Sequence, residues 1–208
     1  MTSIHPAEAP MPFDELLAKL KSFPAPLLAP DTTQDPSLSD SIASLFLHPA
    51  IEALFHIMNH DLPSAHFLVR HMQSPPAYEG MYVHGILHRI EGDFNNARAW
   101  YSDVGEWEGF SRFWGAVDAA GEENGQKLPR QKSAREFLDR VENGAKSGVK
   151  DEDVESLRSK SRDEVEDLLD WCLKRVGKDM HKDATKPSEE ISKIGEEQVS
   201  GSGGPRKF

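Results

Sequence analysis

The sequence contains very little cysteine and no long hydrophobic run. Cys172 is the single cysteine among 208 residues, so an internal disulfide and a cysteine-rich metal knuckle are both excluded. No apolar stretch approaches the roughly 18 residues of a membrane-spanning helix. The first residues, MTSIHPAEAPMPFDE, show neither the basic nor the apolar region of a secretory signal. We therefore expect a protein of a reducing compartment, the cytoplasm or the nucleus, with no membrane partner.

Basic residues are scarce in the first part of the chain. Residues 1–124 contain 6 Lys and Arg against 17 Asp and Glu, a net charge of -11, whereas residues 125–208 contain 18 of each kind. An acidic surface repels phosphate groups, and the second part has no sustained basic block to offset that repulsion. We therefore expect neither nucleic acid nor an anionic membrane surface as a partner.

Strand-like patterns are also absent, since no run of β-branched residues alternates with period two. Apolar residues instead recur with helical spacing through residues 12–176, which predicts one all-α domain. We expect a flexible N-terminus at 1–11 and a disordered tail at 177–208, which has too few apolar residues to fold. A polar linker is expected at 121–131. The predicted helices cover residues 12–23, 37–47, 51–59, 63–73, 78–91, 95–104, 107–120, 133–143 and 151–176.

The middle of the chain contains an internal repeat. A shift of 32 residues aligns NHDLPSAHFLVRHM with EGDFNNARAWYSDV, so that Asp61 matches Asp93. Each aspartate stands where a helix needs an N-cap. The same shift aligns Ala65 with Ala97, and Gly85 lies twelve residues before Ala97. These small residues permit two helices to approach closely, and Tyr101 is expected to fill the groove beside them. The repeat therefore predicts two helical hairpins with equivalent caps and crossings.

These positions resemble the tetratricopeptide repeat, a helical hairpin of 34 residues. The resemblance covers about residues 50–105, with a spacing of 32 and with Ala53 in place of the first glycine. No third copy follows, so we expect two stacked hairpins flanked by further helices. The stretch HGILHRIEGDFNNARAWY also resembles a recurring motif, H-G-x-L-H-R-x-E-G-D-x-x-N-A-x-x-W-Y, of uncharacterised fungal and bacterial proteins. That resemblance implies a recurring unit and no biochemical activity.

Seven of the nine histidines lie between positions 48 and 88. If the hairpins stack, Glu52 and His56 on one first helix would face His84 and His88 on the next. Three imidazoles and a carboxylate suit Zn²⁺, or iron or manganese with added water. The alternative is that these histidines are structural and donate to a carbonyl or a carboxylate at a helix interface.

Established catalytic motifs are absent. HGILH has Gly85 where a zinc protease carries its glutamate, and the Glu52–His56 spacing differs from that of di-iron bundles. The aromatic residues of 107–114 recur at helical spacing, which is typical of a core, and Cys172 is expected to be buried. We therefore expect a non-catalytic protein–protein interaction scaffold that needs no cofactor. The alternative is a histidine-dependent metal-binding protein, or an enzyme, that uses Glu52, His56, His84 and His88 with zinc or another divalent metal.

Overall fold

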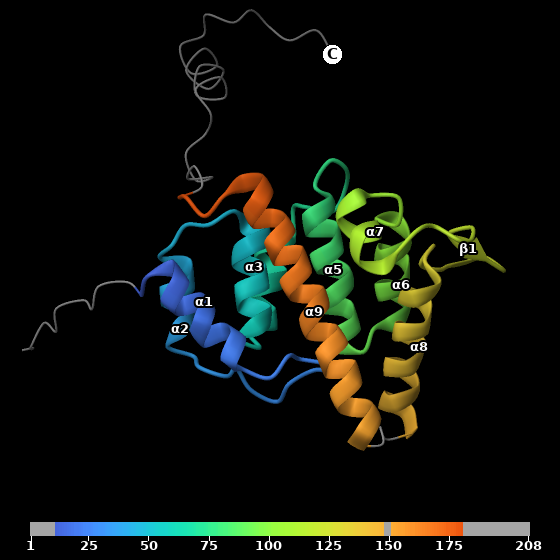
Figure 1. Cartoon of the computed structure of the whole chain (residues 1–208), viewed down its shortest axis with the longest axis horizontal. Coiled ribbons are helices and arrows are strands. Elements are labelled where there is room, and N and C mark those ends of the chain that lie inside the picture. Colours follow the sequence, from blue (N-terminus) through green and yellow to red (C-terminus); the bar gives the residue numbers. More distant parts are fainter. Residues whose placement is uncertain (1–10, 148–150, 181–208) are drawn as a thin grey trace, which may run out of the picture.

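The structure is a computed structural model that describes residues 11–147 and 151–180 (Figure 1). Helices dominate it, which confirms the predicted all-α class, whereas the predictions for residues 1–10 and 181–208 lie outside the described residues. The long helix α9 crosses the helices of the repeat region, and α8 runs beside its first half. The helices are α1 Phe13–Ser22, α2 Leu38–Ala43, α3 Pro49–Met58, α4 Leu62–Val69, α5 Tyr78–Glu91, α6 Phe94–Asp103, α7 Glu108–Trp114, α8 Lys132–Ser147 and α9 Asp151–Val176.

One small sheet interrupts the predicted polar linker. Strands β1, Glu122–Glu123, and β2, Gln126–Lys127, pair antiparallel around Asn124 and Gly125. Both turn residues have positive φ, 52° and 79°, as a two-residue hairpin turn of type I′ requires. These two-residue strands leave the all-α class unchanged, and the Asn-Gly pair is a typical sequence signal for such a hairpin.

The helix predicted over residues 107–120 is shorter than expected. It ends at Trp114, because Gly115 adopts φ 90° and ψ -173°, a conformation that cannot continue a helix. The aromatic residues before this stop do belong to the core, as predicted: Phe110 is fully buried and Trp114 is 3% exposed.

The hairpins α3–α4 and α5–α6 have equivalent caps. The side chains of Asp61 and Asp93 each accept a hydrogen bond from the backbone N–H three residues later, at 3.3 Å in both cases. Their own backbone N–H groups donate to the carbonyls of His56 and His88, both at 2.8 Å. The predicted N-caps are therefore confirmed, while the likeness to tetratricopeptide repeats stays a prediction.

Gly85 lies where α5 crosses α6. A Cβ atom at this position would come within 2.5 Å of the Tyr101 ring, closer than real Cβ contacts. Tyr101 is fully buried, so its ring could move only by disturbing the core around it. The crossing therefore depends on a residue without a side chain at Gly85, as the sequence predicted.

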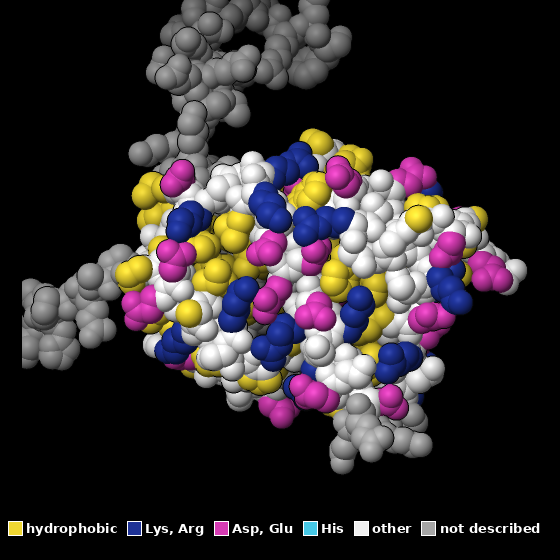
Figure 2. All heavy atoms as spheres, viewed as in Figure 1, with side chains coloured by type: hydrophobic (Ala, Val, Ile, Leu, Met, Phe, Trp, Pro, Cys, Tyr) yellow, Lys and Arg dark blue, Asp and Glu magenta, His cyan; other side chains and the backbone are white. Residues whose placement is uncertain are grey.

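Helix α9 packs against the repeat region and α7 along one side. It buries Leu157, Val165, Leu168, Leu169 and, as predicted, Cys172. Figure 2 shows the face along α9, where Lys and Arg side chains alternate with Asp and Glu and hydrophobic side chains appear between them. No helix in the described part of the chain is both long enough and apolar enough to cross a membrane.

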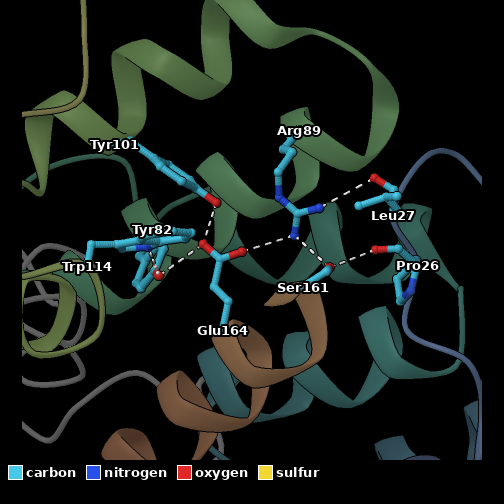
Figure 3. Close-up of polar contacts among 8 residues, drawn as sticks. All are labelled: Pro26, Leu27, Tyr82, Arg89, Tyr101, Trp114, Ser161 and Glu164. Carbon is cyan, nitrogen blue, oxygen red and sulfur yellow. Dashed lines mark hydrogen bonds and ion pairs between the residues drawn. The ribbon is translucent and has the colours of Figure 1, made fainter. Parts of the chain in front are cut away.

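A buried ion pair joins α5 to α9 (Figure 3). Arg89 Nη2 lies 3.0 Å from Glu164 Oε2, and neither side chain has any exposed surface. Burial by itself would lower the pKa of Arg89, but the Glu164 carboxylate raises it above the ordinary value. Arg89 therefore stays charged inside the core, where a charge without a partner would be very costly.

Hydroxyl groups and backbone carbonyls complete the surroundings of this pair. Tyr82 donates to Glu164 Oε1 at 3.0 Å, and Tyr101 donates to the same oxygen. Arg89 also donates to Ser161 Oγ at 3.0 Å, and Ser161 donates in turn to the carbonyl of Pro26 at 2.9 Å. Burial and the nearby Glu164 charge raise the pKa of both tyrosines well above its ordinary value, so both remain donors. The network thereby connects α5, α6, α9 and the segment before α2.

Replacing one member of the buried pair is expected to be far more damaging than replacing both. Glu164→Leu leaves Arg89 charged and unpaired, so the free energy of unfolding should fall by about 3–5 kcal/mol. The double variant Arg89→Met/Glu164→Leu should lose less than the sum of the two single variants, because no unpaired charge remains. Urea unfolding followed by circular dichroism measures the free energy of unfolding of the single variants Glu164→Leu and Arg89→Met and of the double variant.

The exposed pair Lys127–Asp103, 2.7 Å apart, provides the control, and Lys127→Met should cost about 0–1 kcal/mol. Strictly additive losses in the double variant would show that the buried charges do not depend on each other.

Candidate functional site

A surface groove runs between α2, α3 and α4. Its volume is about 460 Å³, within the range of ligand sites. Polar and apolar side chains share its walls, which are formed by Ser39, Asp40, Ala43, Glu52, His56, Pro63, Ser64, Phe67 and Leu68. Two of the four residues predicted as metal ligands, Glu52 and His56, therefore lie in this α2–α4 groove, one helical turn apart on α3.

Glu52 is a half-buried carboxyl group that has no partner among the described residues. Within the described residues, the structure places no hydrogen-bond donor or cation on its side chain. Burial raises its pKa from 4.5 to about 7, because the charged form loses hydration and gains no compensating contact. A perturbed carboxyl group in a groove is a physical reason to place a ligand there.

His56 is held by the carboxylate that caps α4. Its Nδ1 lies 3.1 Å from Asp61 Oδ2, the oxygen to which Ser39 also donates at 3.1 Å. Burial lowers the pKa of His56, and the neighbouring Asp61 opposes that effect only in part. His56 is therefore neutral at pH 7, with its Nδ1–H directed to Asp61 and Nε2 left as the acceptor.

Phe67 provides an exposed apolar surface at the same groove. Its side chain is 62% exposed, one of the few large hydrophobic residues of the described chain with that much surface in water. The Arg70 guanidinium lies 3.6 Å from the centre of its ring, a cation–π contact. The groove therefore combines a carboxyl group without a partner with an accessible aromatic ring.

His84 and His88 lie elsewhere, in a cluster with a histidine of α4. The ring of His66 lies 5.9 Å from that of His84 and 5.5 Å from that of His88, centre to centre. His84 stacks on Trp100 at 4.8 Å and donates from Nε2 to the Val69 carbonyl at 3.0 Å. Burial first, and then the neighbouring histidines, lower the pKa values of His84 and His88. These rings are therefore neutral at pH 7.

The four predicted ligands are thus divided between two places. Glu52 and His56 line the α2–α4 groove, whereas His84 and His88 contact His66 at the α4–α5 interface. Among the described residues, no three His, Cys, Asp or Glu side chains are arranged to hold a metal ion. The sequence prediction missed His66 because it paired only the first helices of the hairpins, while α4 also packs on α5.

Comparison of the chain with protein-family models, curated proteins and solved structures finds no match. What the α2–α4 groove can do therefore follows from its own residues. Glu52 can accept a hydrogen bond or pair with a cation, and Phe67 can pack against an apolar group.

Replacing Glu52 with the neutral isostere Gln should change stability only at higher pH. The folded pKa of about 7 exceeds the ordinary 4.5, so the contribution of Glu52 to stability is complete below about pH 4.5 and is lost as the pH rises through 7. At pH 8 we expect Glu52→Gln to be more stable than the natural protein by about 1–2 kcal/mol, a value reduced by solvent screening. At pH 4.5 the two should be equal.

Thermal unfolding at both pH values tests this, with the exposed Glu155→Gln as the control. A stability difference for Glu52→Gln that is the same at pH 4.5 and pH 8 would contradict the raised pKa.

Proposed function

We propose that this protein is a non-catalytic interaction protein that binds a partner protein in the α2–α4 groove. The observation that carries the proposal is the Glu52 carboxyl group, unpaired among the described residues, in the same groove as the exposed Phe67 ring. Buried polar groups normally have partners, and solvent-exposed aromatic rings are common anchors at protein interfaces. A ligand that satisfies both residues would gain a charge-assisted contact and an apolar contact together.

The residues of the groove also define the chemistry of the partner. Glu52 and Asp40 supply negative charge, and the surrounding part of the chain is strongly acidic. A Lys or Arg side chain would therefore be attracted and would lower the pKa of Glu52 by stabilising its charged form. An adjacent Leu, Met or Phe would cover Phe67. We propose a partner segment in which a basic and an apolar residue are neighbours.

The setting that we propose is the cytoplasm. The single cysteine, Cys172, is a free, buried thiol whose pKa is raised by burial to about 12, and a chain without an internal disulfide suits a reducing compartment. Hairpins of the proposed tetratricopeptide-like kind usually present surfaces to other proteins, which agrees with a role in binding.

Short capped peptides test the proposal directly. Acetyl-Leu-Lys-Leu-amide, titrated into ¹⁵N-labelled protein, should shift amide resonances of α2, α3 and α4, whereas acetyl-Leu-Glu-Leu-amide should not. Glu52→Gln and Phe67→Ala should each weaken binding of the lysine peptide by about three- to tenfold.

Phe46 gives a matched control, since its side chain is 54% exposed and does not line the groove. Phe46→Ala should leave the affinity unchanged. Equal binding of the lysine and glutamate peptides, or undiminished binding by Phe67→Ala, would refute the proposed site.

Metal binding is the second candidate function, favoured by one observation. His66 Nε2 lies 3.0 Å from Glu91 Oε1, and His84 Nε2 donates to a carbonyl at the same distance. Histidines that ligate metals commonly place their second nitrogen on such a group. To hold one ion, the remaining ring nitrogens of His66 and His84 and a nitrogen of His88 would have to turn toward a single point. If the four predicted ligands act together, the side chains of Glu52 and His56 would have to turn toward that point as well.

Zinc content measured after exposure to Zn²⁺ and dialysis tests this function. A metal site should retain about one ion per chain, and His84→Ala and His88→Ala should lose it. His71→Gln, at an exposed histidine outside the cluster, should retain the ion. Zinc content near zero in the natural protein would remove this candidate.

A further inference from the structure

A second groove lies on another part of the molecule. It runs between residues 24–34, here called the connector, the end of α8 and the beginning of α9, and its volume is about 620 Å³. Much of its wall is apolar, with Pro26, Leu28, Pro30, Ala145 and Val154 among its residues. We call it the connector groove. A volume of this size and a largely apolar wall are typical of small-molecule sites.

The connector is held in place from behind by backbone contacts. The carbonyls of Pro26 and Leu27 accept hydrogen bonds from Ser161 and Arg89, members of the buried network. The Pro24 carbonyl accepts from His60 Nε2 at 2.8 Å. One wall of the groove is therefore fixed before any ligand arrives, which reduces the entropy lost on binding.

Among the described residues that line the connector groove, Arg158 is the only cation. It is half-buried on α9. Of the arginines in the described residues, it is the one to which the structure gives no hydrogen bond, ion pair or ring contact. Asp31 lines the same groove but forms no ion pair with it. A half-buried guanidinium has five N–H donors to satisfy, so this position favours an anionic ligand.

His60 does not compete with that ligand as a second charge. Its Nε2–H donates to the Pro24 carbonyl, and its Nδ1 accepts from Gln34 Nε2 at 3.0 Å, so the ring is neutral and both nitrogens are occupied. Burial, and to a lesser degree the charge of Arg158, lowers its pKa. Of the described residues that line the groove, Arg158 thus carries the one positive charge. The Asp31 carboxylate lies in the same lining without pairing with it, so the guanidinium can bind one carboxylate of a ligand.

We infer that the connector groove binds a small carboxylic acid with an apolar chain, whose carboxylate pairs with Arg158 while the chain lies along the connector. The guanidinium fork matches both oxygens of a carboxylate. The apolar wall favours a hydrocarbon body over a highly charged ligand such as a nucleotide, whose several phosphates would find one cation among the described residues. This inference is independent of the α2–α4 groove and of its partner.

Decanoate, below its micelle concentration, is the probe, and decan-1-ol is the matched neutral compound. Isothermal titration calorimetry should show that decanoate binds more tightly than decanol to the natural protein. Arg158→Gln should weaken decanoate binding about tenfold or more and should change decanol binding less than twofold. Arg158→Lys, which keeps the charge but not the fork, should retain part of the affinity.

Arg175→Gln, near the other end of α9, is the control and should bind decanoate normally. Thermal unfolding of each variant shows whether it is folded. Equal affinities for decanoate and decanol, or normal decanoate binding by a folded Arg158→Gln protein, would overturn the inference. So would Arg158-dependent binding of acetyl-Leu-Asp-Leu-amide without binding of decanoate, because the occupant would then be an acidic peptide.

Discussion

The arrangement of the helices depends on the buried pair of Arg89 and Glu164. Removing two charges from water costs several kcal/mol for each ion, and their attraction repays that cost only when the remaining donors and acceptors are also satisfied. Here Tyr82, Tyr101 and Ser161 supply those contacts. A shift of α9 by one turn would separate all of them at once. The pair and its hydrogen bonds are therefore satisfied together in the observed position of α9 against the hairpins.

The same network determines where the surface is hollow. Because Arg89 and Ser161 hold the carbonyls of Leu27 and Pro26, the connector lies against the core without forming a helix of its own. Prolines suit such a segment, since they cannot donate backbone hydrogen bonds. His60 adopts φ 61° just beyond the end of α3 and fastens the connector through Pro24 and Gln34. The connector groove is thus a consequence of how the core satisfies its buried charge.

Features that depend on near neighbours in the chain could be predicted from the sequence. The caps at Asp61 and Asp93 and the close crossing at Gly85 follow from residues a few positions away or from the internal repeat. The partnership of Arg89 with Glu164 could not be predicted, because 75 residues separate them and charged side chains are seldom buried. One signal was present: Arg89 lies two turns after Tyr82, on the same buried face of α5.

The sequence indicated which residues belong to the candidate sites, but it did not indicate which of them lie together. The 32-residue shift correctly equated the N-caps of α4 and α6, Asp61 and Asp93, yet the histidines that it aligns differ in their contacts. His56 lies 3.1 Å from Asp61, whereas its counterpart His88 lies 3.8 Å from Asp93 and contacts the ring of His66. The cause is that α4 packs on α5, the first helix of the second hairpin. On the corresponding side of α3, the first helix of the first hairpin, lies the α2–α4 groove.

This difference explains how one repeated backbone can provide two kinds of surface. In the first hairpin, Asp61 both caps α4 and holds His56, so the same carboxylate stabilises the fold and shapes the wall of the groove. At the position of Glu52, the second hairpin carries His84, which is covered by Trp100 and bonded to a carbonyl. A carboxyl group placed there would lose its hydration without gaining a partner, whereas a neutral imidazole fits. Burial by the preceding hairpin therefore favours the imidazole of His84 in the second hairpin. The carboxyl group of Glu52, with its proposed ligand contact, is found only at the equivalent position of the first hairpin.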